Sequence, residues 1–315
     1  MDILVTEELD APAIQRLAEK HRLLRDGTLW KDAAKLKAAI REARAVMVRN
    51  QTQITAEIIA AAPQLVAIGR LGVGLDNIDV PAASKAGVVV IAPLDANATS
   101  VAELTLGLML ALARKIPAGD RSTKAGGWDR KGCTGIELDG RTLALCGYGR
   151  IGRRVAARAE AFGMRVVVFD PFAGAETPGR CGRLEDALAQ ADFVSVHMPL
   201  SAETKHMFDT GKFDVMKRGA FFINTSRGGL VDEAALVAAL RSGQLAGAGL
   251  DVREVEPPRA ATELETLDNV ILTPHIGAFT AEAQTRTIEA VAADIDRVLR
   301  GEPAQNFVNF AQPRR

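Results

Sequence analysis

The chain has 315 residues, which is long for one domain and suits two. Its 39 basic and 39 acidic residues cancel, so charge gives no reason to expect nucleic acid or a membrane as a partner. No apolar run is long enough to span a bilayer, and no leader-like segment precedes the first apolar run. Three scattered cysteines show no metal-binding spacing and suit a reducing compartment. A cytoplasmic protein without a metal site is expected.

The first hundred residues alternate between short apolar runs and stretches rich in Ala, Leu, Lys and Glu. This alternation predicts a parallel sheet covered by helices. The predicted strands are Asp2–Val5, Ala45–Val48, Leu65–Ile68 and Val88–Ile91, and the predicted helices include Ala11–Glu19 and Ala33–Ala43. A strongly apolar helix is expected at Ser100–Ala113, long enough to be buried.

The most informative motif is the glycine-rich run Gly147-Tyr148-Gly149-Arg150-Ile151-Gly152. It follows a predicted strand, Leu143–Cys146, and precedes a predicted helix, Arg153–Phe162. A second strand, Val166–Phe169, then ends on Asp170. The glycines let the backbone approach a pyrophosphate, the helix N-terminus offers free N–H groups to it, and the acid accepts from a ribose hydroxyl. The unit predicts a dinucleotide site; the alternative is a glycine-rich turn in an ordinary sheet.

The acid after the second strand also bears on the choice of cofactor. A 2′-phosphate would be repelled by Asp170, and NADP sites commonly supply a nearby Arg instead. Here the next residues are Pro171 and Phe172, and no basic residue follows before Arg180. NAD is therefore favoured over NADP. If Asp170 is only a solvated residue at a strand end, this argument does not apply.

Four further strands are predicted after the glycine turn, and most end on polar residues. They are Phe193–Val196, Phe221–Asn224, Ala248–Leu250 and Val270–Leu272, followed by a long helix at Thr280–Arg300. Ligands of such sheets bind beyond the carboxyl ends of the strands. The fold class is thus α/β, with two Rossmann-like or flavodoxin-like parallel-sheet domains and a cleft between them. We expect a substrate domain of residues 1–97 plus 288–315 and an NAD-binding domain of residues 98–287.

Three of the residues beyond these strands match the chemistry of hydride transfer between a 2-hydroxy acid and NAD. A cation must anchor the substrate carboxylate, a base must take the hydroxyl proton, and a carboxylate should hold that base. Arg227, His275 and Glu256 are of these types. From position alone His275 could also be structural, and Glu256 could be part of a solvent-exposed acidic loop.

At this point the chain resembles the D-2-hydroxyacid dehydrogenase family, most closely its phosphoglycerate dehydrogenase branch. The resemblance covers essentially the whole chain. The matching motifs are Gly69–Asp79, Asn97–Glu103, Gly135–Gly152, His197–Leu200, Asn224–Gly229, Gly249–Pro257 and Pro274–Gly277. The resemblance implies that Arg227 binds the substrate carboxylate and carbonyl, that His275 is the acid/base, and that Glu256 is its partner. It also implies a homodimer built through the cofactor domain.

The remaining site residues follow from the same motifs. For NAD we expect Gly147, Gly149, Arg150, Ile151, Gly152, Asp170, His197, Met198, Pro199, Thr225, Ser226, Asp251 and Gly277. For the substrate we expect Arg49, Arg70, Val73 and Gly74, together with Arg227 and His275. Arg49 and Arg70 would suit a second anionic group on the substrate. If they are ordinary surface charges, that preference disappears.

Two departures from the family pattern stand near the site, and a third concerns the end of the chain. Tyr148 replaces the more usual Leu, and Arg253 stands where an aromatic residue is common. The chain ends soon after its last predicted helix, so feedback by serine through a regulatory domain is not expected.

The expected function is NAD-dependent transfer of a hydride to or from a D-2-hydroxy acid that resembles 3-phosphoglycerate. One alternative is a hydroxypyruvate or glyoxylate reductase. Another, of a different class, is a corepressor-like protein that senses NAD(H) and binds partner proteins.

Overall fold

The computed structural model describes residues 1–314, which form two compact units. Unit 1 comprises residues 1–97 and the chain from Ala278 onward, and unit 2 comprises residues 98–277. The second boundary was expected at 287/288 and lies ten residues earlier. The reason is helix α11 (Ala281–Leu299), which buries Ala283, Thr287 and Val291 and is continuous across the expected boundary.

Unit 1 contains a five-stranded sheet in the order β2-β1-β3-β4-β5, with every pair parallel. This is the flavodoxin-like strand order. The strands are β1 (Ile3–Val5), β2 (Leu23–Arg25), β3 (Ala45–Val48), β4 (Ala67–Arg70) and β5 (Val89–Ile91). Strand β2 was not predicted, because this edge strand is partly exposed and carries an arginine. Strand β4 begins two residues later than expected.

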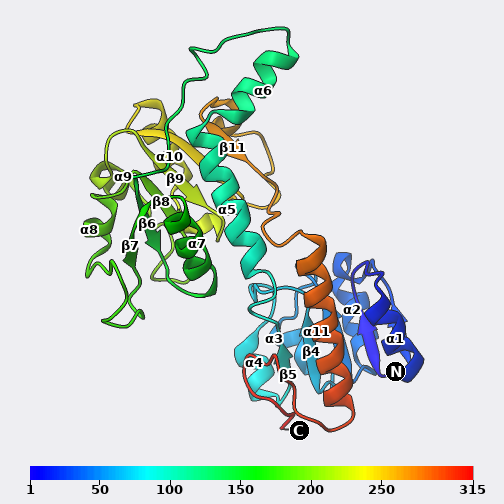
Figure 1. Ribbon diagram of the computed structural model, residues 1–315. Coiled ribbons are helices and arrows are strands. Elements are labelled where there is room, and N and C mark those ends of the chain that lie inside the picture. The colour runs from blue at the N-terminus through cyan, green and yellow to red at the C-terminus, as the bar shows by residue number, and fades with distance from the viewer. Residues whose placement is uncertain (315) are drawn as a thin grey trace. The chain divides into compact units, whose positions relative to one another are not determined.

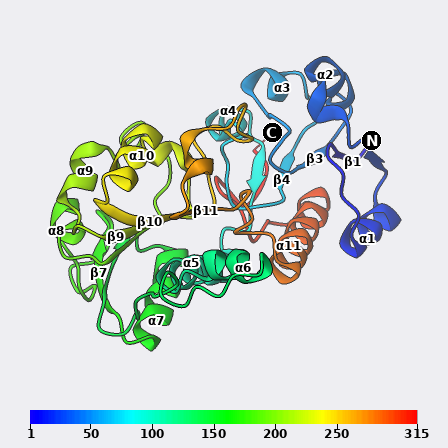
Figure 2. The same cartoon turned by 90° about the horizontal axis from the view of Figure 1, so that it is seen from above.

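Helices cover both faces of this sheet (Figures 1 and 2). Alternate strand residues such as Ile3 and Met47 pack with α1 (Pro12–Lys20) and α11 on one face. Their neighbours, such as Leu4 and Val46, pack on the other face. That face is covered by α2 (Ala33–Ile40), α3 (Ala56–Ala60) and α4 (Val80–Lys85), and the short 3-10 helix η1 (Leu29–Lys31) adds to the same core. Burial on both faces explains the continuous apolar runs of these strands.

Unit 2 contains a six-stranded parallel sheet in the order β11-β10-β9-β8-β6-β7. The strands are β6 (Thr142–Cys146), β7 (Arg165–Phe169), β8 (Phe193–Val196), β9 (Ala220–Asn224), β10 (Leu245–Leu250) and β11 (Val270–Leu272). From β6 the chain proceeds to β7 on one side, and β8 then pairs with β6 on the other. The strand order therefore reverses between β6 and β8, which is where such sheets bind ligands.

Two layers of helices enclose the second sheet (Figure 2). Helices α5 (Ala98–Ala113) and α7 (Arg150–Ala161) cover one face. Helices α8 (Leu184–Leu188), α9 (Thr210–Val215) and α10 (Glu233–Arg241) cover the other. The remaining elements are α6 (Ile116–Lys124), η2 (Gly228–Leu230) and η3 (Glu263–Thr266). Within residues 1–314, no helix is both long and apolar enough to cross a membrane.

The hydrophobic core between the sheet of unit 2 and helices α8, α9 and α10 allows a direct test of the sheet packing. Phe222 of β9 is fully buried and makes edge contacts with Phe208 and Phe213 at ring-centroid distances of 5.2 and 5.4 Å. We expect Phe222→Ala to lower the free energy of unfolding by about 3–5 kcal/mol, because it leaves a cavity in a close-packed core. Phe172→Ala is the matched control, since that side chain is 97% exposed. Urea unfolding followed by circular dichroism measures both, and equal midpoints would contradict the packing described.

Candidate active site

The glycine turn lies between β6 and α7, beside the point where the strand order reverses. Gly147 has φ 102°, a conformation that side chains disfavour, and a Cβ there would lie 2.6 Å from the His197 carbonyl oxygen. Helix α7 begins at Arg150, three residues earlier than predicted. The amides of Arg150 and Ile151 are therefore in its first turn, where helix N–H groups have no intrahelical acceptor. The turn is built to receive an anion.

Asp170 follows β7 and is tied to the glycine turn. Its Oδ2 accepts a hydrogen bond from the Tyr148 amide at 2.7 Å, and its Oδ1 accepts one from the Phe172 amide at 2.8 Å. A carboxylate has about four acceptor positions, so two bonds leave capacity for ribose hydroxyls. The position of Asp170 fits a nicotinamide dinucleotide bound at this turn.

His197 lies across the reversal point, after β8. Its Nε2 is 2.9 Å from the Ser195 hydroxyl. Its Nδ1 is buried, and no hydrogen-bond partner for this atom is found among the described residues. Burial lowers the pKa of His197 to about 4, so the ring is neutral near pH 7. An orphaned polar atom beside the glycine turn fits a pocket that a ligand completes. From the sequence, His197 was named as a cofactor residue without a task for its side chain.

Glu256 and His275 lie together in unit 2. Oε2 of Glu256 is 2.6 Å from Nδ1 of His275, and its Oε1 accepts a hydrogen bond from the Arg253 amide at 2.9 Å. The imidazole is 47% exposed. Because Glu256 engages Nδ1, Nε2 is the ring nitrogen left for another partner. His275 also has φ 55°, an uncommon backbone conformation for a residue other than glycine.

The loop that carries His275 is held by the buried carboxylate of Asp251. Its Oδ1 accepts from the Ile276 amide at 2.8 Å and from the Thr273 hydroxyl at 2.5 Å, while Oδ2 accepts from the Gly277 amide at 2.8 Å. These bonds surround His275 and fix its unusual backbone. The sequence singled out Asp251 and Gly277 only as expected cofactor contacts. The link between them is not visible in the sequence, because it joins the ends of two neighbouring strands.

Arg227 follows β9 in a turn organised by Asn224. The Asn224 amide donates to the Arg227 carbonyl at 2.9 Å, and its Oδ1 accepts from the Ser226 amide at 3.0 Å. The Arg227 guanidinium donates to the Ser226 carbonyl at 2.8 Å. Ser226 and Thr225 fix the same turn through the Met198 carbonyl and the Thr105 hydroxyl. The sequence placed Asn224 in a motif but did not reveal that its side chain organises this turn.

The charges around Glu256 keep it ionised. Burial raises the pKa of Glu256, but this effect is outweighed by the hydrogen bonds from His275 and the Arg253 amide and by the positive charge of Arg227. The net pKa lies below the usual value for glutamate. A carboxylate at this position stabilises a protonated imidazole. The charge states of Arg227 and His275 thus both act on the Glu256 carboxyl.

The four other expected substrate residues belong to unit 1. Arg49 and Arg70 lie at the same edge of the first sheet, because Val48 of β3 pairs with Arg70 of β4. Arg49 donates to Gln284 at 2.9 Å and lies over the Phe279 ring, and Arg70 donates to the Leu71 carbonyl at 2.9 Å. Val73 and Gly74 lie in the turn after β4.

Comparison with known proteins identifies the family. Residues 106–277 match the family described as D-isomer specific 2-hydroxyacid dehydrogenase, NAD binding domain. The chain belongs to this family. Unit 2 is its NAD-binding domain, and NAD is the cofactor that this domain binds.

Named relatives agree with this assignment. The chain is 46% identical over 313 residues to a D-3-phosphoglycerate dehydrogenase from Methanocaldococcus jannaschii, covering 98% of this chain and 59% of that protein. The TT0316 protein from Thermus thermophilus superposes with a TM-score of 0.92 at 37% identity, covering 98% of this chain and 100% of that one. An NADPH-dependent glyoxylate/hydroxypyruvate reductase from Sinorhizobium meliloti gives a TM-score of 0.90 at 30% identity, covering 100% and 98%. The chain spans about three fifths of the length of the curated relatives it matches.

The described residues contain no cluster of three or more His, Cys, Asp or Glu that could hold a metal ion.

The Asp251 contacts make a testable prediction. Asp251→Asn would place an amide group against two backbone donors and the Thr273 hydroxyl, so at least one buried bond is lost. We expect a loss of about 1–3 kcal/mol of stability for this loop. Hydrogen–deuterium exchange of the peptide containing Ile276 and Gly277 should become faster than in the unmodified protein. Asp294→Asn is the control, because Asp294 is an equally buried carboxylate that binds Gln305 and Asn306 in unit 1. Unchanged exchange at 276–277 in Asp251→Asn would contradict the assigned role.

Proposed function

We propose that the protein is an NAD-dependent D-2-hydroxyacid dehydrogenase whose substrate resembles 3-phosphoglycerate. The observation that carries the proposal is the Glu256–His275 contact of 2.6 Å, with Arg227 close enough to influence the same carboxylate. A base, its supporting acid and an anion-binding cation are the groups that oxidation of a hydroxy acid requires. Their place in a domain that binds NAD supplies the remaining requirement.

Each side chain has a defined task in this proposal. When bound, NAD supplies the hydride acceptor. Arg227 binds the substrate carboxylate through its guanidinium fork. Nε2 of His275 takes the hydroxyl proton during oxidation and returns it during reduction. Glu256 stabilises the imidazolium that forms, and Asp251 holds the loop on which His275 sits. Val73 and Gly74 would offer backbone N–H groups to the substrate.

The preference for a substrate with a second anionic group rests on Arg49 and Arg70. Both follow strands at one edge of the first sheet, and the 46%-identical relative is named a D-3-phosphoglycerate dehydrogenase. The second candidate is a glyoxylate or hydroxypyruvate reductase, which the likeness to the Sinorhizobium meliloti enzyme favours. Comparing kcat/KM for phosphohydroxypyruvate and hydroxypyruvate separates them. A phosphate preference below about tenfold would favour the second candidate.

A sensor of NAD(H) that binds partner proteins is the third candidate, from another class. The intact set of Arg227, Glu256 and His275 supports an enzyme instead. Incubation with NADH and a panel of 2-keto acids distinguishes the two, because a sensor oxidises no NADH.

We include a cytoplasmic homodimer in the proposal. All three cysteines are free thiols, as a reducing compartment would keep them. Helix α6 buries no residue within the chain, and Trp128 in the segment after it is 80% exposed. Exposed apolar groups of this kind suit a contact between two cofactor domains.

The acid/base role of His275 predicts a kinetic effect. His275→Ala should lower kcat by at least about 10²-fold, since a positioned acid/base contributes about that much. His21→Ala is a matched control. His21 also pairs with a carboxylate, that of Asp296, at 2.8 Å, but it lies in unit 1 and has no part in the proposed reaction. Steady-state kinetics should show normal turnover in the control. Normal turnover in His275→Ala would remove this residue from the mechanism.

The position of Asp170 predicts the cofactor preference. Asp170→Ala removes the acceptor for the ribose hydroxyls and the charge that repels a 2′-phosphate. We expect the ratio of kcat/KM for NADH over NADPH to fall by at least about tenfold, the effect of one charge-assisted hydrogen bond. The KM for the keto acid serves as an internal control. An unchanged ratio would show that another group selects the cofactor.

A further inference from the structure

We propose that Arg253 is a positioning residue, whose side chain fixes the loop that holds Glu256 in line with His275. The inference rests on the proposed function for its catalytic meaning. Arg253 is the residue that departs from the family pattern beside Glu256, and its side chain is only 10% exposed. It touches neither member of the Glu256–His275 pair through its guanidinium, so any effect on chemistry must pass through the loop.

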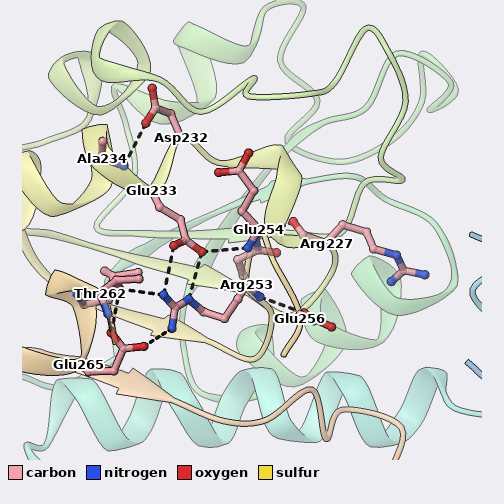
Figure 3. A network of polar contacts seen from close by, with 11 residues as sticks. Arg227, Asp232, Glu233, Ala234, Arg253, Glu254, Glu256, Thr262 and Glu265 are labelled. Carbon is pink, nitrogen blue, oxygen red and sulfur yellow. Dashed lines mark hydrogen bonds and ion pairs between the residues drawn. The ribbon is translucent and has the colours of Figure 1, made fainter. Parts of the chain in front are cut away.

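The guanidinium of Arg253 makes four hydrogen bonds to three neighbours (Figure 3). Its Nε and Nη2 form a fork with the two carboxylate oxygens of Glu233 at 3.0 and 3.1 Å. Its Nη1 donates to Glu265 at 2.5 Å, and its Nη2 also donates to the Thr262 hydroxyl at 2.9 Å. The fork fixes the plane of the group as well as its position.

The partners of Arg253 are themselves held in place. Glu233 is the first residue of α10, whose N-cap Asp232 accepts from the amides of the first turn. Glu265 belongs to η3 and forms a reciprocal capping box with Thr262. The hydrogen bond from Arg253, followed by that from Thr262, lowers the pKa of Glu265 to about 2. Arg253 therefore holds its loop against two structured elements, α10 and η3, through two ion pairs.

The backbone amide of Arg253 connects this anchored loop to Glu256. The Arg253 amide donates to Oε1 of Glu256 at 2.9 Å, which leaves Oε2 for Nδ1 of His275. The next amide, that of Glu254, donates to Glu233 at 2.9 Å. One carboxylate, Glu233, thus binds both the side chain of Arg253 and the backbone that follows it. The Arg253 N–H belongs to the preceding peptide group, so Glu233 anchors the residue that carries this donor without binding the donor itself. A shift of Arg253 would move the donor away from Oε1.

The same loop rests against the turn that carries Arg227. A Cβ on Gly228 would lie 1.9 Å from the carbonyl carbon of Arg253, so only glycine permits this approach. Gly228 is the residue after Arg227. Figure 3 shows the Arg227 side chain directed away from the Arg253 network. The loop of Arg253 is therefore in close contact with the turn of Arg227 at Gly228.

The other charged side chains near Glu256 do not compete with it for His275. Glu254 on the same loop pairs with His206 at 2.7 Å, and Asp251 binds the amides of the His275 loop. Arg227 contributes its positive charge from the turn after β9. Among the described residues, the Arg253 amide is the one backbone donor to the Glu256 carboxylate.

The test compares two substitutions of the same kind. Arg253→Met removes the fork. Arg241→Met is the matched control, because Arg241 links the same two elements, α10 and η3, through Glu263 at 2.6 Å but is exposed and does not contact the loop. We expect kcat to fall roughly tenfold to a hundredfold in Arg253→Met, because small displacements of catalytic groups lower rates by about that much. The control should retain its turnover. The kcat of Arg253→Lys should lie between those of Arg253→Met and Arg241→Met, since a lysine keeps the charge but cannot form the fork.

A pH profile separates positioning from general loss of structure. In Arg253→Met the hydrogen bond to Glu256 weakens, so the pKa of Glu256 should rise toward its usual value. The carboxylate then takes up a proton at a higher pH, and the acidic limb of kcat/KM should move to higher pH. Circular dichroism and the unfolding midpoint monitor folding. A lower kcat with an unmoved acidic limb would assign Arg253 a structural role and overturn the proposal.

Two further measurements make the outcome independent of turnover. Carbon-13 titration of the Glu256 carboxyl, assigned with Glu256→Gln, reports its pKa without substrate or cofactor. It should shift upward in Arg253→Met and not in Arg241→Met; equal titration curves would reject the proposal. In the Glu256→Gln background, Arg253→Met should lower kcat little further. If the double variant instead loses the product of the two single losses in kcat, Arg253 acts independently of Glu256. If the unmodified protein reduces no 2-keto acid, the proposed function fails while the titration still decides the role of Arg253.

Discussion

The hydrogen bond between Glu256 and His275 sets the demands on the rest of unit 2. The imidazole is 47% exposed and the carboxylate 35%, so solvent competes for both groups. An exposed ion pair of this kind contributes little by itself, because water and side-chain entropy oppose it. Its geometry must therefore be imposed by the backbone on either side. Asp251 does this for the loop of His275, and the Arg253 amide does it for Glu256.

This constraint explains where polar groups are buried in the second domain. Asp251, Asn224 and Thr225 are nearly inaccessible, and each follows or ends a strand of the parallel sheet. Burying such groups is unfavourable unless their hydrogen bonds are satisfied. Here they bind the amides and carbonyls of the turns that present Arg227 and His275. The apolar sheet supplies a rigid base, and these few polar contacts determine which way each turn faces.

Much of this arrangement could be predicted from the sequence, for identifiable reasons. Strands such as β3 and β5 are buried on both faces, so they appear as uninterrupted apolar runs. The glycine turn and Asp170 were recognisable because pyrophosphate and ribose contacts demand those residue types at that spacing. The edge strand β2 and the start of α7 were not, since β2 is short and partly exposed and α7 begins inside the glycine motif. The second domain boundary was misplaced because a uniform helix carries no local signal of which body it packs against.

Several of the contacts that the sequence did not reveal are made by backbone amides. The amides of Arg253 and Gly277 carry no sequence signature, because every residue except proline offers the same donor. Arg253 appeared only as an unusual residue near Glu256, and its partners Glu233 and Glu265 lie on either side of it in the chain. A motif identifies the groups that touch a substrate, since chemistry limits their type. The residues that orient those groups can be of many types, and we propose that the ion-paired Arg253 is one of them.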